Sequence, residues 1–96
     1  MVKEHLAWLG LRAKDRVTDL EGVVVSISFD LYGCVQAVLN PGLDKDGKQR
    51  EQTWYDIARL VMVSDAPVMR PPDFLNSASP VAQGLQGPAD KPAFNK

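Results

Sequence analysis

The sequence predicts an all-β fold: a small antiparallel barrel of about five strands, followed by a disordered, proline-rich tail. Two runs, residues 21–29 and 34–39, alternate their side chains with period two and are joined by a short turn. Shorter runs of the same kind lie on either side of them, with turn-forming residues between. After residue 64 the composition changes sharply, because residues 65–96 hold six of the seven prolines and show no apolar periodicity.

Residues 21–40 form the predicted central hairpin. In its first run, one face is expected to carry Val23, Val25, Ile27 and Phe29. The other face of that run is expected to carry Val24 and two serines. In the second run, one face is expected to carry Val35, Ala37 and Leu39. The turn between the runs contains Gly33, a residue type that hairpin turns favour.

The preceding segment has the form in which small SH3-like barrels often begin: a basic residue, Asp15, one further residue and Val17, then a tight turn and Gly22. A short first strand is expected to include Val17. Gly22 is expected to begin the long second strand, since glycine tolerates the dihedral angles of a turn or a bulge. Residues 52–57 and 60–63 are expected to complete an SH3-like barrel.

These observations divide the chain into three parts. Residues 1–10 are predicted to form an N-terminal arm or a short helix, and residues 11–64 the SH3-like barrel. Residues 65–96 are predicted to be a largely disordered tail, because they contain too few large apolar side chains to offset the entropy lost on ordering. Residues 68–75 are the exception, and we expect them to lie as an extended arm along the barrel or along a neighbouring subunit.

The chain has 96 residues, a formal net charge of -1 and one cysteine. A domain of this size buries a limited share of its surface, so we expect a homodimer. The near-neutral charge gives no general attraction for nucleic acid or anionic membranes. No apolar run approaches the ~20 residues that span a bilayer, no secretory leader is recognisable, and a single cysteine suits a reducing compartment. We therefore expect a cytoplasmic protein without a membrane partner.

No pattern of catalytic or metal-binding residues stands out, so we expect neither an enzyme nor a cofactor. The single histidine, His5, has no nucleophile near it in the sequence, and there is no Cys/His cluster for zinc. Cys34 has no neighbouring cation and is interpreted as a buried or half-buried small hydrophobic residue. Residues 44–47 resemble the start of a calcium loop but lack its later ligands. The carboxylates are spread over turns and strand ends: Asp15, Asp19, Glu21, Asp30 and Asp56.

The aromatic residues give the leading functional prediction. Tyr32 lies at the predicted hairpin turn, and Trp54 and Tyr55 are adjacent in a predicted strand. Neighbouring residues in a strand point to opposite faces, so one of that pair must leave the core. Exposed aromatic side chains are common anchors of protein–protein interfaces. We therefore predict a patch that binds a protein partner, formed by Tyr32, Trp54 and Tyr55 with Arg50 and Arg59 at its rim.

Two other functions compete with this one. Basic residues that flank the hairpin would suit a single-stranded nucleic-acid platform together with the aromatics: Arg12, Lys14, Arg16 and Lys48. Alternatively, aromatics and arginines at the seam of a dimer would enclose a small nucleotide-like ligand, which the protein would sequester.

Several blocks of the sequence, in the same order, resemble a family of short proteins from tailed phages and prophages. The blocks are D-R-V-T at 15–18, G-V-V at 22–24, Y-G-C at 32–34, K-D-G-K at 45–48, W-Y-D at 54–56 and R-L at 59–60. The resemblance extends over residues 14–63 and implies a phage or prophage setting. By analogy with other small phage proteins, it implies binding to a host or phage macromolecule, including inhibition of a host defence.

Overall fold

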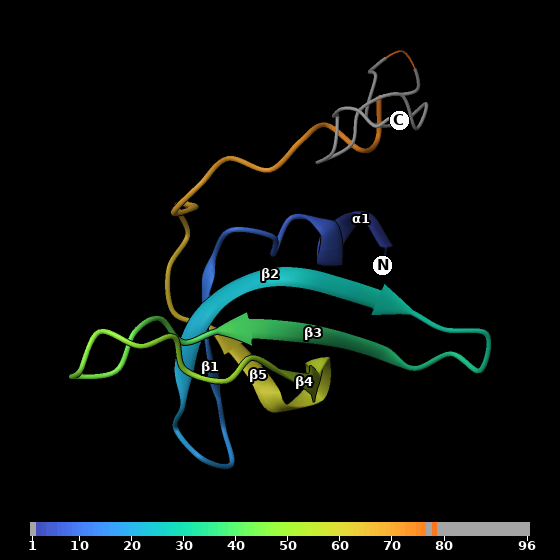
Figure 1. Cartoon of the computed structure of the whole chain (residues 1–96). Coiled ribbons are helices and arrows are strands. Elements are labelled where there is room, and N and C mark those ends of the chain that lie inside the picture. The colour runs from blue at the N-terminus through green and yellow to red at the C-terminus, as the bar shows by residue number, and fades with distance from the viewer. Residues whose placement is uncertain (1, 77, 79–96) are drawn as a thin grey trace, which may run out of the picture.

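The computed structural model describes residues 2–76 and 78 of the chain. Its elements are, in chain order, the helix α1 (Val2–Leu6), the strands β1 (Arg12–Asp15), β2 (Glu21–Phe29), β3 (Val35–Asn40) and β4 (Thr53–Asp56), the 3₁₀ turn η1 (Ile57–Arg59) and the strand β5 (Leu60–Met62). The strands form one antiparallel sheet in the order β4-β3-β2-β1-β5 (Figure 1). The predicted all-β fold is therefore confirmed.

The sheet curls strongly around one side of the long β2–β3 hairpin. In Figure 1, β1, β5 and β4 lie below this hairpin, and α1 lies above it. The single turn η1 connects β4 to β5, which are the two edge strands. Within the described residues no ladder joins these two edges, so the sheet curls without closing.

A β-bulge in β2 corrects the predicted faces of the hairpin. Val24 pairs with Leu39 and Ser26 pairs with Val38, so Val25 is an extra residue in β2. Val24 is 1% exposed, whereas Val25 is 44% exposed. The prediction that Val23, Val25, Ile27 and Phe29 share one face is therefore wrong, because the bulge moves the inward face from Val24 to Ile27. In β3, Ala37 and Leu39 are both buried on one face, as predicted.

The first strand is shorter than predicted. It ends at Asp15, and Val17 lies in the following turn with 72% of its surface exposed. The Asp15 carboxylate forms this turn by accepting hydrogen bonds from the backbone N–H groups of Val17 and Thr18, at 3.4 and 3.1 Å. Side-chain acceptors of this kind compete with strand pairing for backbone donors, which explains why β1 stops before Val17.

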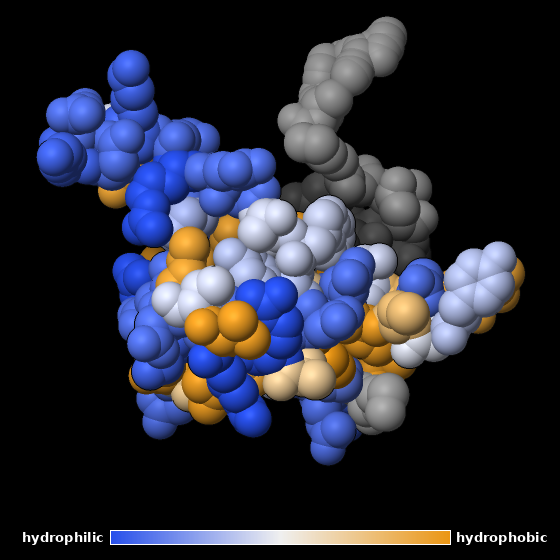
Figure 2. Space-filling view, turned by 90° about the horizontal axis from the view of Figure 1, so that it is seen from below, coloured by the Kyte–Doolittle hydropathy of each residue, from blue (hydrophilic) through white to orange (hydrophobic). Residues whose placement is uncertain are grey.

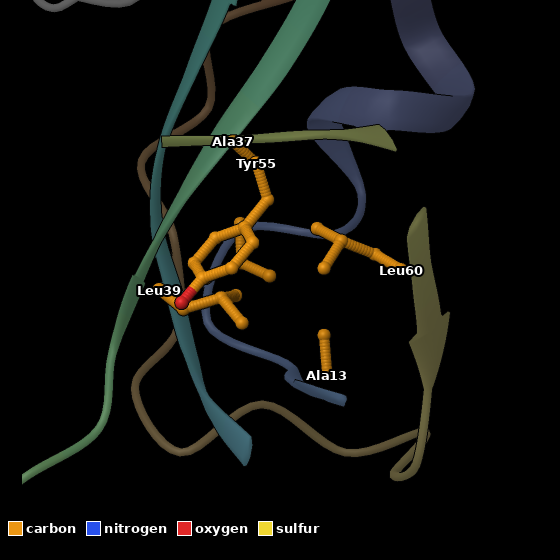
Figure 3. Close-up of a cluster of buried hydrophobic side chains, with 6 residues drawn as sticks. Ala13, Ala37, Leu39, Tyr55 and Leu60 are labelled. Atoms are coloured by element: carbon orange, nitrogen blue, oxygen red, sulfur yellow. The ribbon is translucent and has the colours of Figure 1, made fainter. Parts of the chain in front are cut away.

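The core is built from the inward faces of all five strands. Figure 3 shows the Tyr55 ring of β4 pointing towards Leu39 of β3, with Leu60 and Ala13 close by. The buried apolar side chains are Ala13, Val24, Ala37, Leu39, Tyr55 and Leu60. Trp8, Leu9, Leu20, Ile27 and Met62 pack around them and are partly buried. The N-terminal segment therefore contributes to the packing of the sheet.

Gly10 joins the segment that precedes β1 to the segment that follows β5. Its N–H donates to the Val24 carbonyl at 2.8 Å, and its carbonyl accepts from the N–H of Val68 at 2.8 Å. Gly10 has a φ of +90°, and a Cβ there would stand 2.4 Å from the Met69 carbonyl oxygen. Residues 67–74, which we call the arm, therefore lie along the domain's own surface. Most of the predicted tail, residues 77 and 79–96, falls outside the described residues.

Candidate functional site

The outward face of the sheet carries a row of apolar side chains, which we call the outer strip: Val23, Val25, Val38 and Trp54. Val38 and Trp54 are direct cross-strand partners, and the bulge residue Val25 directly precedes Ser26, the β2 partner of Val38. Trp54 is 48% exposed and Val25 is 44% exposed. The strip thus crosses three neighbouring strands and places an aromatic ring near one edge of the sheet.

Trp54 and Tyr55 point to opposite sides of β4. Tyr55 is buried at 8% exposure because its pairing partner, Ala37, belongs to the inward face of β3. Trp54 faces solvent because its partner, Val38, belongs to the outward face. The structure thus separates the adjacent pair and removes Tyr55 from the predicted exposed patch.

Tyr32 lies at the end of the β2–β3 hairpin, away from Trp54. It precedes the start of β3, and Val38, the partner of Trp54, lies three residues inside that strand, roughly 10 Å further along by the strand rise. Tyr32 is 88% exposed and its neighbour Leu31 is 90% exposed. In Figure 2 the hairpin end and the loop of residues 41–52 project on opposite sides, with apolar side chains at the hairpin end and mostly hydrophilic ones on the loop.

The hairpin end has a defined turn. The Asp30 carboxylate accepts hydrogen bonds from the N–H groups of Tyr32 and Cys34, at 2.9 and 2.8 Å. The same Asp30 carboxylate raises the pKa of the Cys34 thiol, so Cys34 stays protonated at neutral pH. A protonated thiol is a poor nucleophile. Cys34 is exposed, so its interpretation as a buried or half-buried residue is wrong, because it lies in the hairpin turn before β3 begins.

Arg59, predicted at the rim of the patch, forms an ion pair with Asp15. Its Nε and Nη2 donate to Oδ1 and Oδ2 of Asp15 at 2.8 and 2.6 Å, and its guanidinium lies 5.2 Å from the centre of the Tyr55 ring. Asp15 is fully buried and also accepts from the Thr18 hydroxyl at 2.6 Å. The guanidinium, helped by the Thr18 and Val17 donors, holds the pKa of the Asp15 carboxyl well below its usual range.

The other predicted basic residues lie on two parts of the surface. Arg12 and Lys14 point outward from β1, since Ala13 between them is buried, and Arg16 is exposed just beyond this strand. Lys14 Nζ lies 3.9 Å from Asp19 Oδ1. The remaining two, Lys48 and Arg50, are exposed on the loop of residues 41–52, where Arg50 Nη1 donates to the Pro41 carbonyl at 3.5 Å.

A pocket of about 610 Å³ lies at the β2 end of the outer strip, between β2 and the arm. Val23 and Val25 line it from the sheet, and Val68 and Phe74 line it from the arm. Two basic residues, Arg12 and Arg70, and the polar residue Asn40 also line it. Sequence reasoning missed this pocket, because it depends on the arm lying over β2. The signals available were Gly10 and the apolar residues of the arm.

Comparison with protein-family models, with curated proteins and with solved structures found no match to this chain. Within residues 2–76 and 78, no group of three or more His, Cys, Asp and Glu side chains is placed to hold a metal ion. The helices of this described part are too short or too polar to cross a membrane.

Proposed function

We propose that the protein is a non-catalytic binding module that recognises a protein partner through the outer strip, with Trp54 as its anchor. The observation that carries this proposal is the 48% exposure of an indole ring that lies on the outward face of the edge strand β4, paired with Val38 of β3. Tryptophan is among the residues that contribute most to protein–protein affinity when a partner covers them.

The position of Trp54 in the sheet supports a protein as the partner. β4 is an edge strand, and in the described part of the chain its outer backbone groups join no ladder. A partner that covers the indole therefore also reaches backbone donors and acceptors, which peptide strands use when they add to a sheet edge. The strip itself carries no charge, so burying it needs no compensating ion pair.

The proposal also includes the finer fold and the setting. We take the curled sheet as an SH3-like barrel, supported by the strand order β4-β3-β2-β1-β5 and by the 3₁₀ turn between β4 and β5. The resemblance of residues 14–63 to small phage proteins supports a role as a phage or prophage accessory protein in the bacterial cytoplasm. A host-defence protein is one partner of the proposed kind.

Affinity capture with matched variants tests the proposal. The full-length chain is tagged and expressed in bacteria, and co-purifying proteins are quantified by mass spectrometry for the wild type, Trp54→Glu and Leu43→Glu. Leu43 is the control, because it is an apolar residue with 62% exposure on the loop of residues 41–52, outside the strip. We expect at least one protein to be retained by the wild type and by Leu43→Glu and lost from Trp54→Glu.

Affinity measured with the identified partner gives the magnitude. Trp54→Ala should raise the Kd about 30-fold or more, as expected for an interface anchor worth roughly 2 kcal/mol. The circular dichroism spectrum and the unfolding midpoint of each variant show whether the fold is kept. Equal partner binding by folded Trp54→Glu and wild-type protein would refute the proposal.

A further inference from the structure

We propose that the pocket between β2 and the arm binds a small organic anion: a carboxylate or sulfonate joined to an aromatic or aliphatic body. This ligand site goes beyond the proposed binding of a protein partner: it shares Val23 and Val25 with the outer strip, but the proposed anchor Trp54 does not line it. It also lies within one chain, so it needs no dimer seam.

The size and the walls of the pocket fit a ligand with an apolar body. Its volume of about 610 Å³ is within the range of roughly 300–1,000 Å³ found for small-molecule sites. Valines of β2 form one wall, and Val68, Pro71 and Phe74 of the arm form the facing wall. A ligand between them would cover the half-exposed surfaces of Val25 and Phe74, which are 44% and 43% exposed.

The charges at the pocket select an anion. Among the residues that the structure describes, its lining includes two arginines, Arg12 and Arg70, and no Asp or Glu. Neither arginine makes an ion pair with any residue that the structure describes. This contrasts with Arg59, which is bound on two sides by Asp15. Two arginines without an ion-pair partner in the described part of the chain, beside apolar walls, therefore favour a carboxylate or sulfonate, which guanidinium groups bind through paired hydrogen bonds.

Backbone contacts hold the arm over the sheet before any ligand arrives. The N–H of Val68 donates to the Gly10 carbonyl at 2.8 Å, and the N–H of Arg12 donates to the Ser64 hydroxyl at 3.0 Å just before the arm begins. Gly10 also permits the close approach of Met69, where a Cβ would collide with the backbone. A preformed wall lowers the entropy lost on binding.

Anilinonaphthalene sulfonate and its matched uncharged analogue test the site in the full-length protein. The analogue, phenylnaphthylamine, has the same ring system without the sulfonate. We expect the sulfonate to bind saturably at one site per chain, to raise the unfolding midpoint, and to bind more tightly than the analogue. Arg12→Gln and Arg70→Gln should each weaken sulfonate binding about threefold to tenfold, with little effect on the analogue. Arg16→Gln and Lys48→Gln, which change basic residues outside the lining, should leave it unchanged.

Opposite charges at one wall residue locate the ligand. Val25→Glu should abolish sulfonate binding, whereas Val25→Lys should keep or strengthen it, because the two side chains have similar size and opposite charge. Decanoate should displace the dye and decanol should not. The proposal would be overturned if the two Val25 variants bound the sulfonate dye equally well. It would also be overturned if both arginine variants bound the dye as tightly as the wild type. Dye binding by folded Trp54→Glu separates this site from the protein interface, so either proposal can fail alone.

Discussion

The ion pair between Asp15 and Arg59 is the residue-scale feature on which the domain most depends. It joins two segments that are 44 positions apart and lies against Tyr55 of the core. We predict that Asp15→Asn lowers the unfolding midpoint by on the order of 10 °C, because a buried site built for a carboxylate loses its charge while Arg59 stays cationic. Lys14→Met, which breaks the exposed contact with Asp19, should change it by about 1 °C or less. Similar midpoints for the two variants would contradict this account.

The same ion pair predicts how stability depends on pH. The folded-state pKa of Asp15 is depressed below its unfolded value of 3.8. The stabilisation is therefore complete well above about pH 4, and it is lost as the pH falls from there towards the depressed folded-state pKa. Urea unfolding followed from neutral pH to about pH 2 should show a steeper acid loss for the wild type than for Asp15→Asn. Parallel curves would show that other groups dominate the acid limb.

At the scale of elements, the close approach of β2 and β3 at Gly22 makes a specific prediction. A Cβ at Gly22 would stand 2.7 Å from the Asn40 carbonyl oxygen and 3.1 Å from Pro41 Cα, which are backbone atoms that have little room to move. Gly22→Ala should lower the free energy of unfolding by about 1–3 kcal/mol, measured by chemical denaturation. Ser28→Ala, which changes a partly exposed residue of the same strand, should alter it by less than about 0.5 kcal/mol. If Gly22→Ala left the free energy of unfolding unchanged, the backbone of Asn40 and Pro41 would have to move away from β2 at little cost in energy.

The elements also show what the sequence alone predicts. Period-two alternation and turn residues are local, so the strands and their antiparallel pairing follow from them. Local signals do not determine which face of β2 points into the core. The three consecutive valines, 23–25, fit either orientation, and the position of the bulge depends on the pairing of β2 with β3. Val17 has high strand propensity, yet the Asp15 carboxylate takes its N–H for a turn. Local propensity therefore predicts a first strand that continues to Val17, whereas β1 ends at Asp15.

The candidate site divides in the same way. Alternation predicts that one of Trp54 and Tyr55 leaves the core, but the pairing of β4 with β3 decides which one. From its residue type alone, Arg59 is expected to be exposed to solvent. Only the fold brings its guanidinium to the Asp15 carboxylate. The pocket depends on Gly10 meeting the arm, a contact between residues that are 58 or 59 positions apart in the chain. Contacts between distant segments are thus the part that single-sequence patterns leave undetermined.

For the whole molecule, the small core and the outer strip together favour self-association. Among the described residues, six buried apolar side chains form the core, and the strip leaves an indole half exposed. In the absence of a partner, two copies can cover this strip by a two-fold contact in which each Trp54 meets the other chain. We predict that light scattering gives twice the mass of the chain, and that the unfolding midpoint rises with protein concentration.

Variants at the strip test this dimer and connect it to function. Trp54→Glu should be monomeric, with an unfolding midpoint that no longer depends on concentration, while Leu43→Glu should remain a dimer. A wild-type chain that is monomeric at millimolar concentration would contradict the prediction, as would a dimer that survives in Trp54→Glu. If the same indole serves both contacts, a protein partner must compete with the second copy. The dimer should then dissociate as partner is added, because one surface cannot be covered twice.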